Sequence, residues 1–276
     1  MSLGPRARGS RRVPEPDAHA SAAPAARRRP SRALLVATAL AVIAACQRSS
    51  GPTTAHRSPT PLDASTTGTI TGHVRFSGAK PAPRRVQVTS DPTCVAAHRD
   101  GLDVDDVRGD DGVLADAFVY VARGLGDRVF AVPETPVVVD QRGCVFDPPV
   151  AGAQVGQPIA FVNGDDTLHN VHGTPTKSSA WNFGLAVRGA RRTITVDHPE
   201  VPVGVQCDVH PWMHAAVAVV DHPYFTVTAE DGAFTLARVP HGHYTLAAWH
   251  PQLGTRERDI EVTAGVTTNV DLTFAP

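Results

Sequence analysis

Residues 205–214 read VQCDVHPWMH, and this stretch decides the fold. It holds one of the four cysteines and one of the two methionines of the chain, each three residues from His210. Valines alternate with other residues over 201–205, which predicts a β-strand with one buried face, and Cys207 continues that face. The apolar run 215–220 predicts a second strand. The thiol, the imidazole and the thioether are therefore expected on a short loop between two strands.

Further candidate ligands lie upstream, in FVNGDDTLHNVH at 161–172. His169 and Val171 share one face of the predicted strand, so His169 can point inward. His172 lies on the opposite face and is expected near the site or at the surface rather than as a ligand. One thiolate, two imidazoles and a thioether form the soft ligand set of blue-copper sites, whereas zinc sites take four ligands without a thioether. The predicted ligands of one copper ion are His169, Cys207, His210 and Met213.

Both stretches resemble the cupredoxins, and the resemblance covers roughly residues 134–221. The spacing C-x-x-H-x-x-M after a strand, with Pro211 and Trp212 between histidine and methionine, is similar to the short ligand loop of the amicyanin type. The upstream run resembles the strand that carries the family's first ligand, where Asn and Val follow the histidine. The pattern that leads into that strand also matches, at Gly156, Ile159, Phe161 and Asn163.

This resemblance implies a Greek-key β-sandwich and a role in electron transfer. By position it assigns the copper to the same four residues, and it makes the side chain of Asn170 a link between the two ligand segments beside the thiolate. In cupredoxins the edge of the loop histidine emerges through an apolar patch where partners dock. Pro211 and Trp212 would form part of that patch here. The alternative is that Trp212 packs inward.

The C-terminal third carries a second resemblance. Residues 225–251 contain T-x-x-D-G-x-F-x-L-x-x-V-P-x-G-x-Y-x-L, which resembles the carboxypeptidase regulatory-like module, a small transthyretin-like β-sandwich. The first strands of such a module lie far upstream, as TITGHVRF and ADAFVYV between residues 69 and 121. We therefore predict a discontinuous sandwich of residues 67–130 and 222–275, with a cupredoxin domain at 134–221 inserted into it. The alternative is three consecutive units.

Strand-like segments separated by turn residues recur along the chain. They predict an all-β protein with β-sandwich architecture. The acidic segment 91–115 is the exception and is expected to be a solvated loop. Its carboxylates do not have the spacing of a calcium-binding loop.

The first 46 residues are expected to be a signal peptide. The uncharged run at 33–45 is too short for a membrane span of about 20 residues, but it fits the apolar core of a signal peptide. It ends in IAAC, which resembles the lipobox of bacterial lipoproteins and implies a lipid on Cys46. The protein would then be anchored in the bacterial cell envelope, periplasmic or at the outer surface; the alternative is an ordinary secretory signal. Residues 47–66 are rich in Ser, Thr and Pro and are predicted to form a flexible linker.

Export also bears on the cysteines, because disulfides persist outside the cytoplasm. With Cys46 lipidated and Cys207 binding metal, Cys94 and Cys144 remain. Two remaining cysteines can pair, so a Cys94–Cys144 disulfide is predicted. The alternative is two unpaired buried thiols.

These features favour a membrane-tethered carrier of single electrons whose partner is a cytochrome or another copper protein. A net charge of −1 argues against a nucleic-acid binder, and the chain has no G-x-S-x-G, P-loop or H-E-x-x-H motif, so no enzyme is expected. Two alternatives remain: a non-redox module that binds carbohydrate or protein and has a structural copper, and a copper storage or delivery protein. A weaker possibility is a second metal site among the scattered histidines 198, 222, 241, 243 and 250.

Overall fold

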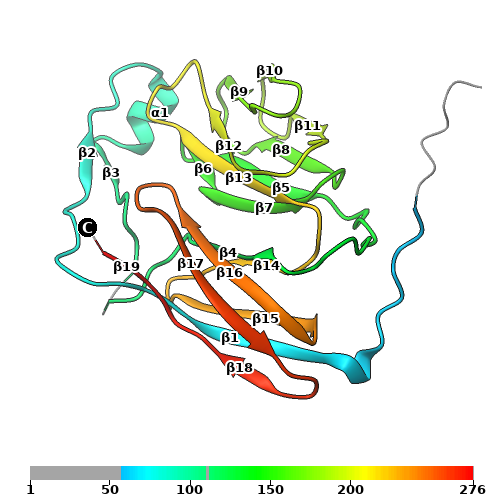
Figure 1. Ribbon diagram of the computed structural model, residues 1–276. Helices are drawn as coiled ribbons and strands as arrows, with labels where there is room; N and C mark the ends of the chain where they lie inside the picture. The colour runs from blue at the N-terminus through cyan, green and yellow to red at the C-terminus, as the bar shows by residue number, and fades with distance from the viewer. Residues whose placement is uncertain (1–56, 110–111, 276) are drawn as a thin grey trace, which may run out of the picture. The chain divides into compact units, whose positions relative to one another are not determined.

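The computed structural model describes residues 57–109 and 112–275 (Figure 1). The predicted signal peptide with Cys46, and residues 47–56 of the predicted linker, lie outside the described residues. The described part consists of strands, one short α-helix and one 3₁₀ turn, η1 (Ala64–Thr66), which confirms the all-β fold class. Neither of its helical segments is long and apolar enough to cross a membrane.

One β-sandwich, the terminal sandwich, joins the two ends of the described chain. Its sheets have the orders β15-β1-β18, with β19 also paired to β1, and β14-β4-β16-β17. The strands are β1 (Thr67–Phe76), β4 (Phe118–Arg123), β14 (Phe225–Val227), β15 (Ala233–Pro240), β16 (Gly242–His250), β17 (Gly254–Val262), β18 (Thr267–Asn269) and β19 (Leu272–Phe274). Strand β1 pairs antiparallel with β15 and parallel with β18 and β19. Segments on both sides of residues 134–221 therefore share one core.

Alternation and turn chemistry form this sandwich. Ile70 and Val74 are fully buried on one face of β1, and they alternate with more exposed residues. The turn that connects β14 to β15 crosses from one sheet to the other and is not the hairpin that the sequence had indicated, but it still needs its glycine: Gly232 has φ +67, and a Cβ there would lie 2.7 Å from the carbonyl oxygen of Val74. Glycine is thus required at 232 both by the backbone conformation and by the close approach of β1.

The second β-sandwich, the central sandwich, contains the predicted ligands. Its sheets have the orders β10-β9-β12-β13-β7 and β11-β8-β5-β6. The strands are β5 (Val137–Arg142), β6 (Val145–Asp147), β7 (Val150–Gln154), β8 (Ile159–Asn163), β9 (His169–Gly173), β10 (Trp181–Leu185), β11 (Arg191–Ile194), β12 (Glu200–Gln206) and β13 (His214–Val220). Phe161, Val171 and Val205 lie in one apolar core with Cys207 and Met213.

A third apolar cluster joins the two sandwiches. Phe118 of β4 and Trp249 of β16 pack with Val150, Ala216 and Val220 of β7 and β13. Strands β13 and β16 are therefore buried on both faces, which explains why they read as continuous apolar runs instead of alternating.

The acidic segment 91–115 is not simply a loop, as the sequence had suggested. It contains α1 (Pro92–Ala97) and β3 (Leu102–Val104), which pairs with β2 (Arg84–Val86). Asp91 caps α1: its carboxylate accepts hydrogen bonds from the backbone N–H groups of Thr93 and Cys94. A helix of six residues is too short to show a 3.6-residue periodicity, so the pattern of apolar residues could not predict it.

Candidate metal centre

Strand pairing brings the predicted ligands together at one end of the central sandwich. His169 is the first residue of β9, and Cys207 directly follows β12, which pairs antiparallel with β9. The loop after β12 is tight, because the N–H of Cys207 donates to the carbonyl oxygen of Met213 at 3.1 Å and the N–H of Met213 donates to that of His210 at 2.9 Å. These bonds fix the backbone positions of Cys207, His210 and Met213, and the pairing of β9 with β12 places His169 beside them.

Three nitrogen and sulfur atoms converge. The two Nδ1 atoms of His169 and His210 lie 3.0 Å apart, and Sγ of Cys207 lies 3.7 Å from Nδ1 of His210. Metal bonds of about 2.0–2.1 Å to imidazole nitrogen and about 2.3 Å to thiolate sulfur place donor atoms roughly 3.3–3.8 Å apart around one ion. The N–S separation lies in this range and the N–N separation is slightly shorter, so the three side chains fit one metal ion.

All four predicted ligands are buried. His169 and His210 are 0% exposed, Cys207 is 2% exposed and Met213 is 1% exposed. Cys207 and Met213 belong to the same apolar core. Water is thereby excluded from the thiol and from the thioether, and such an apolar surrounding controls solvent access to a metal ion.

Asn170 connects the two ligand segments. Its backbone N–H donates to Sγ of Cys207 at 3.4 Å, and its side-chain oxygen accepts a hydrogen bond from the N–H of Asp208 at 2.8 Å. His172, on the other face of β9, has Nδ1 3.0 Å from a carboxylate oxygen of Asp208 and is half-buried. These contacts hold the start of the ligand loop against β9.

Hydrogen bonds and burial set the protonation of the site. Burial raises the pKa of the Cys207 thiol, but the hydrogen bond with His169 and those from backbone N–H groups outweigh it, so the pKa is lowered. Burial lowers the pKa of His169, but the hydrogen bonds with Cys207 and Asp165 outweigh this and raise it. Burial, followed by the charge of His169, lowers the pKa of His210. The site therefore makes deprotonation of Cys207 easier, and the thiolate is the form that binds metal.

Two carboxylates that the sequence patterns did not single out also reach the site. Nε2 of His169 lies 3.0 Å from a carboxylate oxygen of Asp165, and Nε2 of His210 lies 3.8 Å from one of Asp91. Asp165 is four residues before His169 in a turn, and Asp91 lies far upstream. No periodicity or motif marks either residue.

Cys94 and Cys144 form a disulfide that covers His210. The S–S distance is 2.05 Å, and Sγ of Cys94 lies 3.6 Å from Nε2 of His210. The indole N–H of Trp212 donates to the carbonyl oxygen of Cys144 at 2.9 Å, and its ring centroid is 5.2 Å from that of His210. The expectation that the edge of His210 emerges at the surface is wrong, because the side chain is 0% exposed and Cys94, on α1, lies against its outer nitrogen.

The predicted docking residues keep different exposures. Pro211 is exposed and Trp212 is half-buried, packed against the central core. Trp212 also lines a cavity of about 270 Å³ together with His214, and with His250 and Pro251 of the terminal sandwich. The indole is thus the side chain that touches both His210 and a recess open to solvent.

The remaining histidines are not gathered into a second site. Among residues 57–109 and 112–275, each cluster of three or more His, Cys, Asp or Glu side chains includes His169 or His210. Histidines 198, 222, 241, 243 and 250 belong to no such cluster.

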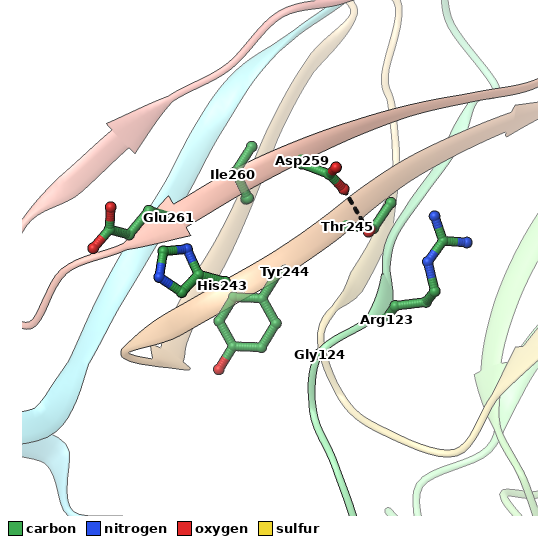
Figure 2. Close-up of a pocket in the computed structure, with 8 residues that line it drawn as sticks. All are labelled: Arg123, Gly124, His243, Tyr244, Thr245, Asp259, Ile260 and Glu261. Atoms are coloured by element: carbon green, nitrogen blue, oxygen red, sulfur yellow. Dashed lines mark hydrogen bonds between the residues drawn. The ribbon is translucent and has the colours of Figure 1, made fainter.

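A shallow hollow of about 470 Å³ lies on the terminal sandwich, where β4 separates from β16 (Figure 2). Thr245 donates a hydrogen bond to Asp259 within it, and Arg123 forms an ion pair with Glu257 at its edge. Thr245, Asp259 and Arg123 are therefore already engaged within the chain.

Comparison with known proteins supports the C-terminal resemblance. The model of the carboxypeptidase regulatory-like domain matches residues 208–275, a minority of the chain. The match begins inside the ligand loop and includes β13, although β13 pairs with β12 and β7 of the central sandwich. No protein of curated function matches the chain.

Several solved copper proteins resemble part of the chain. A copper-containing nitrite reductase from Thermus scotoductus is 25% identical with a TM-score of 0.29, covering 35% of this chain and 24% of its own. A reduced amicyanin variant is 22% identical with a TM-score of 0.29, and the match covers 32% of this chain and 85% of the amicyanin. A purple cupredoxin from Nitrosopumilus maritimus is 17% identical with a TM-score of 0.26, covering 30% and 98%. At these TM-scores the likenesses carry no weight for function, which has to be argued from the site.

Proposed function

We propose that the protein binds one type 1 copper ion at His169, Cys207, His210 and Met213 and carries single electrons between partners in the bacterial cell envelope. The observation that carries this proposal is the convergence of two Nδ1 atoms and one Sγ atom, all within 4.8 Å of one another, in the buried end of a β-sandwich. A thioether follows on the same loop.

The donor set supports copper over zinc. Two imidazoles and one thiolate leave room for a weak fourth ligand, and the buried residue next in the loop is a methionine rather than a cysteine, histidine or carboxylate. A His₂Cys set with a thioether is typical of blue-copper electron-transfer sites. When bound there, copper supplies a one-electron couple.

The residues of this chain provide a rigid, dry cage. β9 and β12 are paired, the loop is closed by two backbone hydrogen bonds, and Asn170 ties the loop to β9. Ligands held this firmly change position little when the charge of the ion changes, which keeps the cost of electron transfer low.

The route to a partner is proposed to run through Trp212. His210 is closed off, whereas the indole touches its ring and lines a recess. Docking at Pro211 and Trp212, a redox partner of the cytochrome or copper-protein class, and lipid anchoring through Cys46 are parts of the same proposal.

The test is the visible and EPR spectrum of the copper-loaded chain, followed by titration with a reductant. An intense blue absorption that bleaches reversibly with one electron per protein supports the proposal. A copper-loaded chain that stays redox-silent would instead favour a binding module with structural copper. Rapid transfer of copper to an acceptor apoprotein would favour delivery. The hollow in Figure 2 gives the binding module limited support, because Thr245, Asp259 and Arg123 in it already pair within the chain.

A further inference from the structure

We infer that Asp165 and Asp91 are positioning residues that link the two imidazoles to the Cys94–Cys144 disulfide and hold the copper centre toward its oxidised state. This inference rests on the proposed function. It concerns side chains outside the cupredoxin ligand motif, and it gives the disulfide a role in the centre.

Asp165 joins His169 to one half of the disulfide. One carboxylate oxygen accepts the backbone N–H of Gly143 at 2.8 Å; the other accepts that of Cys144 at 2.8 Å and lies 3.0 Å from Nε2 of His169. The backbone N–H of Asp165 donates in turn to Asn163, whose amide group bonds two carbonyl oxygens. Asp165 is 8% exposed, and both of its carboxylate oxygens accept backbone hydrogen bonds, so the carboxylate is held facing His169.

Asp91 lies between His210 and the other half of the disulfide, close to the imidazole but without a hydrogen bond to it. One carboxylate oxygen accepts the N–H groups of Thr93 and Cys94 at 2.9 and 3.2 Å. The other accepts the hydroxyl of Thr167 and lies 3.8 Å from Nε2 of His210. Asp91 has φ +83, a conformation that non-glycine residues rarely adopt, and its four contacts show what holds it there.

The two arrangements are parallel. Each half-cystine donates its backbone N–H to a carboxylate, and that carboxylate faces Nε2 of one histidine. Nε2 carries the proton that a carboxylate accepts, so Nδ1 of His169 is left free to bind metal. The disulfide fixes the distance between the two carboxylates because it joins α1 to the turn between β5 and β6.

Two carboxylates at the outer edges of the imidazoles have an electrostatic consequence. Both imidazoles are 0% exposed, and the side chains of Asp165 and Asp91 are 11% and 20% exposed, so the charge of Asp165 in particular is weakly screened. Negative charge stabilises the more positive metal state, and a hydrogen-bonded carboxylate also makes the histidine a stronger donor. Both effects favour Cu(II) over Cu(I) and lower the reduction potential.

The experiment compares the full copper-loaded chain with Asp165→Asn and with the matched control Asp166→Asn. Asp166 is the adjacent carboxylate, 70% exposed and paired with Arg188. Asparagine at 165 keeps an acceptor oxygen but loses the charge. We expect the ratio of Cu(I) to Cu(II) affinity to rise about tenfold, which raises the potential by about 59 mV for a one-electron couple. The control is expected to change that ratio less than twofold.

Asp91→Asn is the second variant, because asparagine still caps a helix and tolerates a positive φ. A smaller rise in potential is expected, since its carboxylate is farther from the imidazole. If Asp165→Asn fails to fold, Asp91→Asn alone tests the inference. Alkylation of Cys94 and Cys144 without prior reduction would show that the disulfide, and with it the fold, has not formed. A purely structural role would weaken both copper states equally and leave the potential at the wild-type value, which would overturn the inference.

Different results would contradict the proposed function and the role of the two carboxylates. A wild-type chain without a blue centre overturns the proposed function and this inference with it. A blue wild-type chain whose potential is as insensitive to Asp165→Asn and Asp91→Asn as to Asp166→Asn overturns the inference alone.

Discussion

The ligand loop at 205–214 and the cover formed by α1 and the disulfide contact the same histidine, yet they are encoded very differently. The loop is local: its alternating valines and the three-residue spacing of Cys207, His210 and Met213 stand together in the sequence. The cover is assembled from segments that are distant in the sequence. Cys94 lies 116 positions before His210, and Cys144 lies in the turn between β5 and β6. Ligands that are close together in the sequence can thus be predicted from it, whereas the residues that surround them depend on tertiary contacts.

Removing the thiolate gives the largest expected effect on the loop side of this comparison. In Cys207→Ser the hydroxyl is a far weaker ligand for copper than a thiolate, so the blue absorption should disappear completely. The spectrum of the copper-loaded variant measures this. A variant that kept the blue band would show that Cys207 is not a ligand.

Removing the disulfide tests the cover. The bridge closes a loop with a sequence separation of 50, so the double variant Cys94→Ala/Cys144→Ala should lose about 4 kcal/mol of unfolding free energy. The opened cover should also admit small external ligands such as azide to the copper, seen as a shift in the EPR spectrum. Wild type reduced by a phosphine is the control. Equal stability, with no new access, would mean that the cover does not depend on the disulfide.

His250 provides a contrast with His169 and His210, because it is a buried histidine that belongs to no metal cluster. Burial lowers its pKa from 6.5 to about 4. The folded state therefore favours the neutral imidazole. The free energy of unfolding is highest above pH 6.5, and it decreases as the pH falls from 6.5 toward 4, because the unfolded state binds the proton first. The loss should reach roughly 3 kcal/mol. Urea titrations at several pH values measure this change in unfolding free energy. The pH dependence should be smaller in His250→Gln; an equally steep dependence in that variant would mean that another group causes it.

The smallest effect is expected at the joint between loop and cover. Trp212→Phe keeps an aromatic ring beside His210 but loses the hydrogen bond to the carbonyl oxygen of Cys144. The unfolding free energy should fall by about 1 kcal/mol while the blue absorption is unchanged. A large loss of absorption in this variant would mean that the indole, and not the backbone of the loop, holds His210.

The sequence predicted what depends on periodicity, turn chemistry and ligand type. The resemblance to the regulatory-like module put the strand at 69–76 in one sandwich with residues after 222, and β1 pairs with β15. The four candidate ligands follow from residue types and spacing. The covering helix, Asp91 and Asp165 could not be predicted, because a six-residue helix and single carboxylates leave no periodic signal. The burial of His210 was missed for the same reason.

The most direct test of the central claim is X-ray absorption at the copper edge of the loaded chain, read for the atoms around the ion. The account predicts one copper per chain, with one short bond to sulfur from Cys207 and two bonds to imidazole nitrogen from His169 and His210. A shell of only nitrogen and oxygen atoms, unchanged in Cys207→Ser, would contradict it.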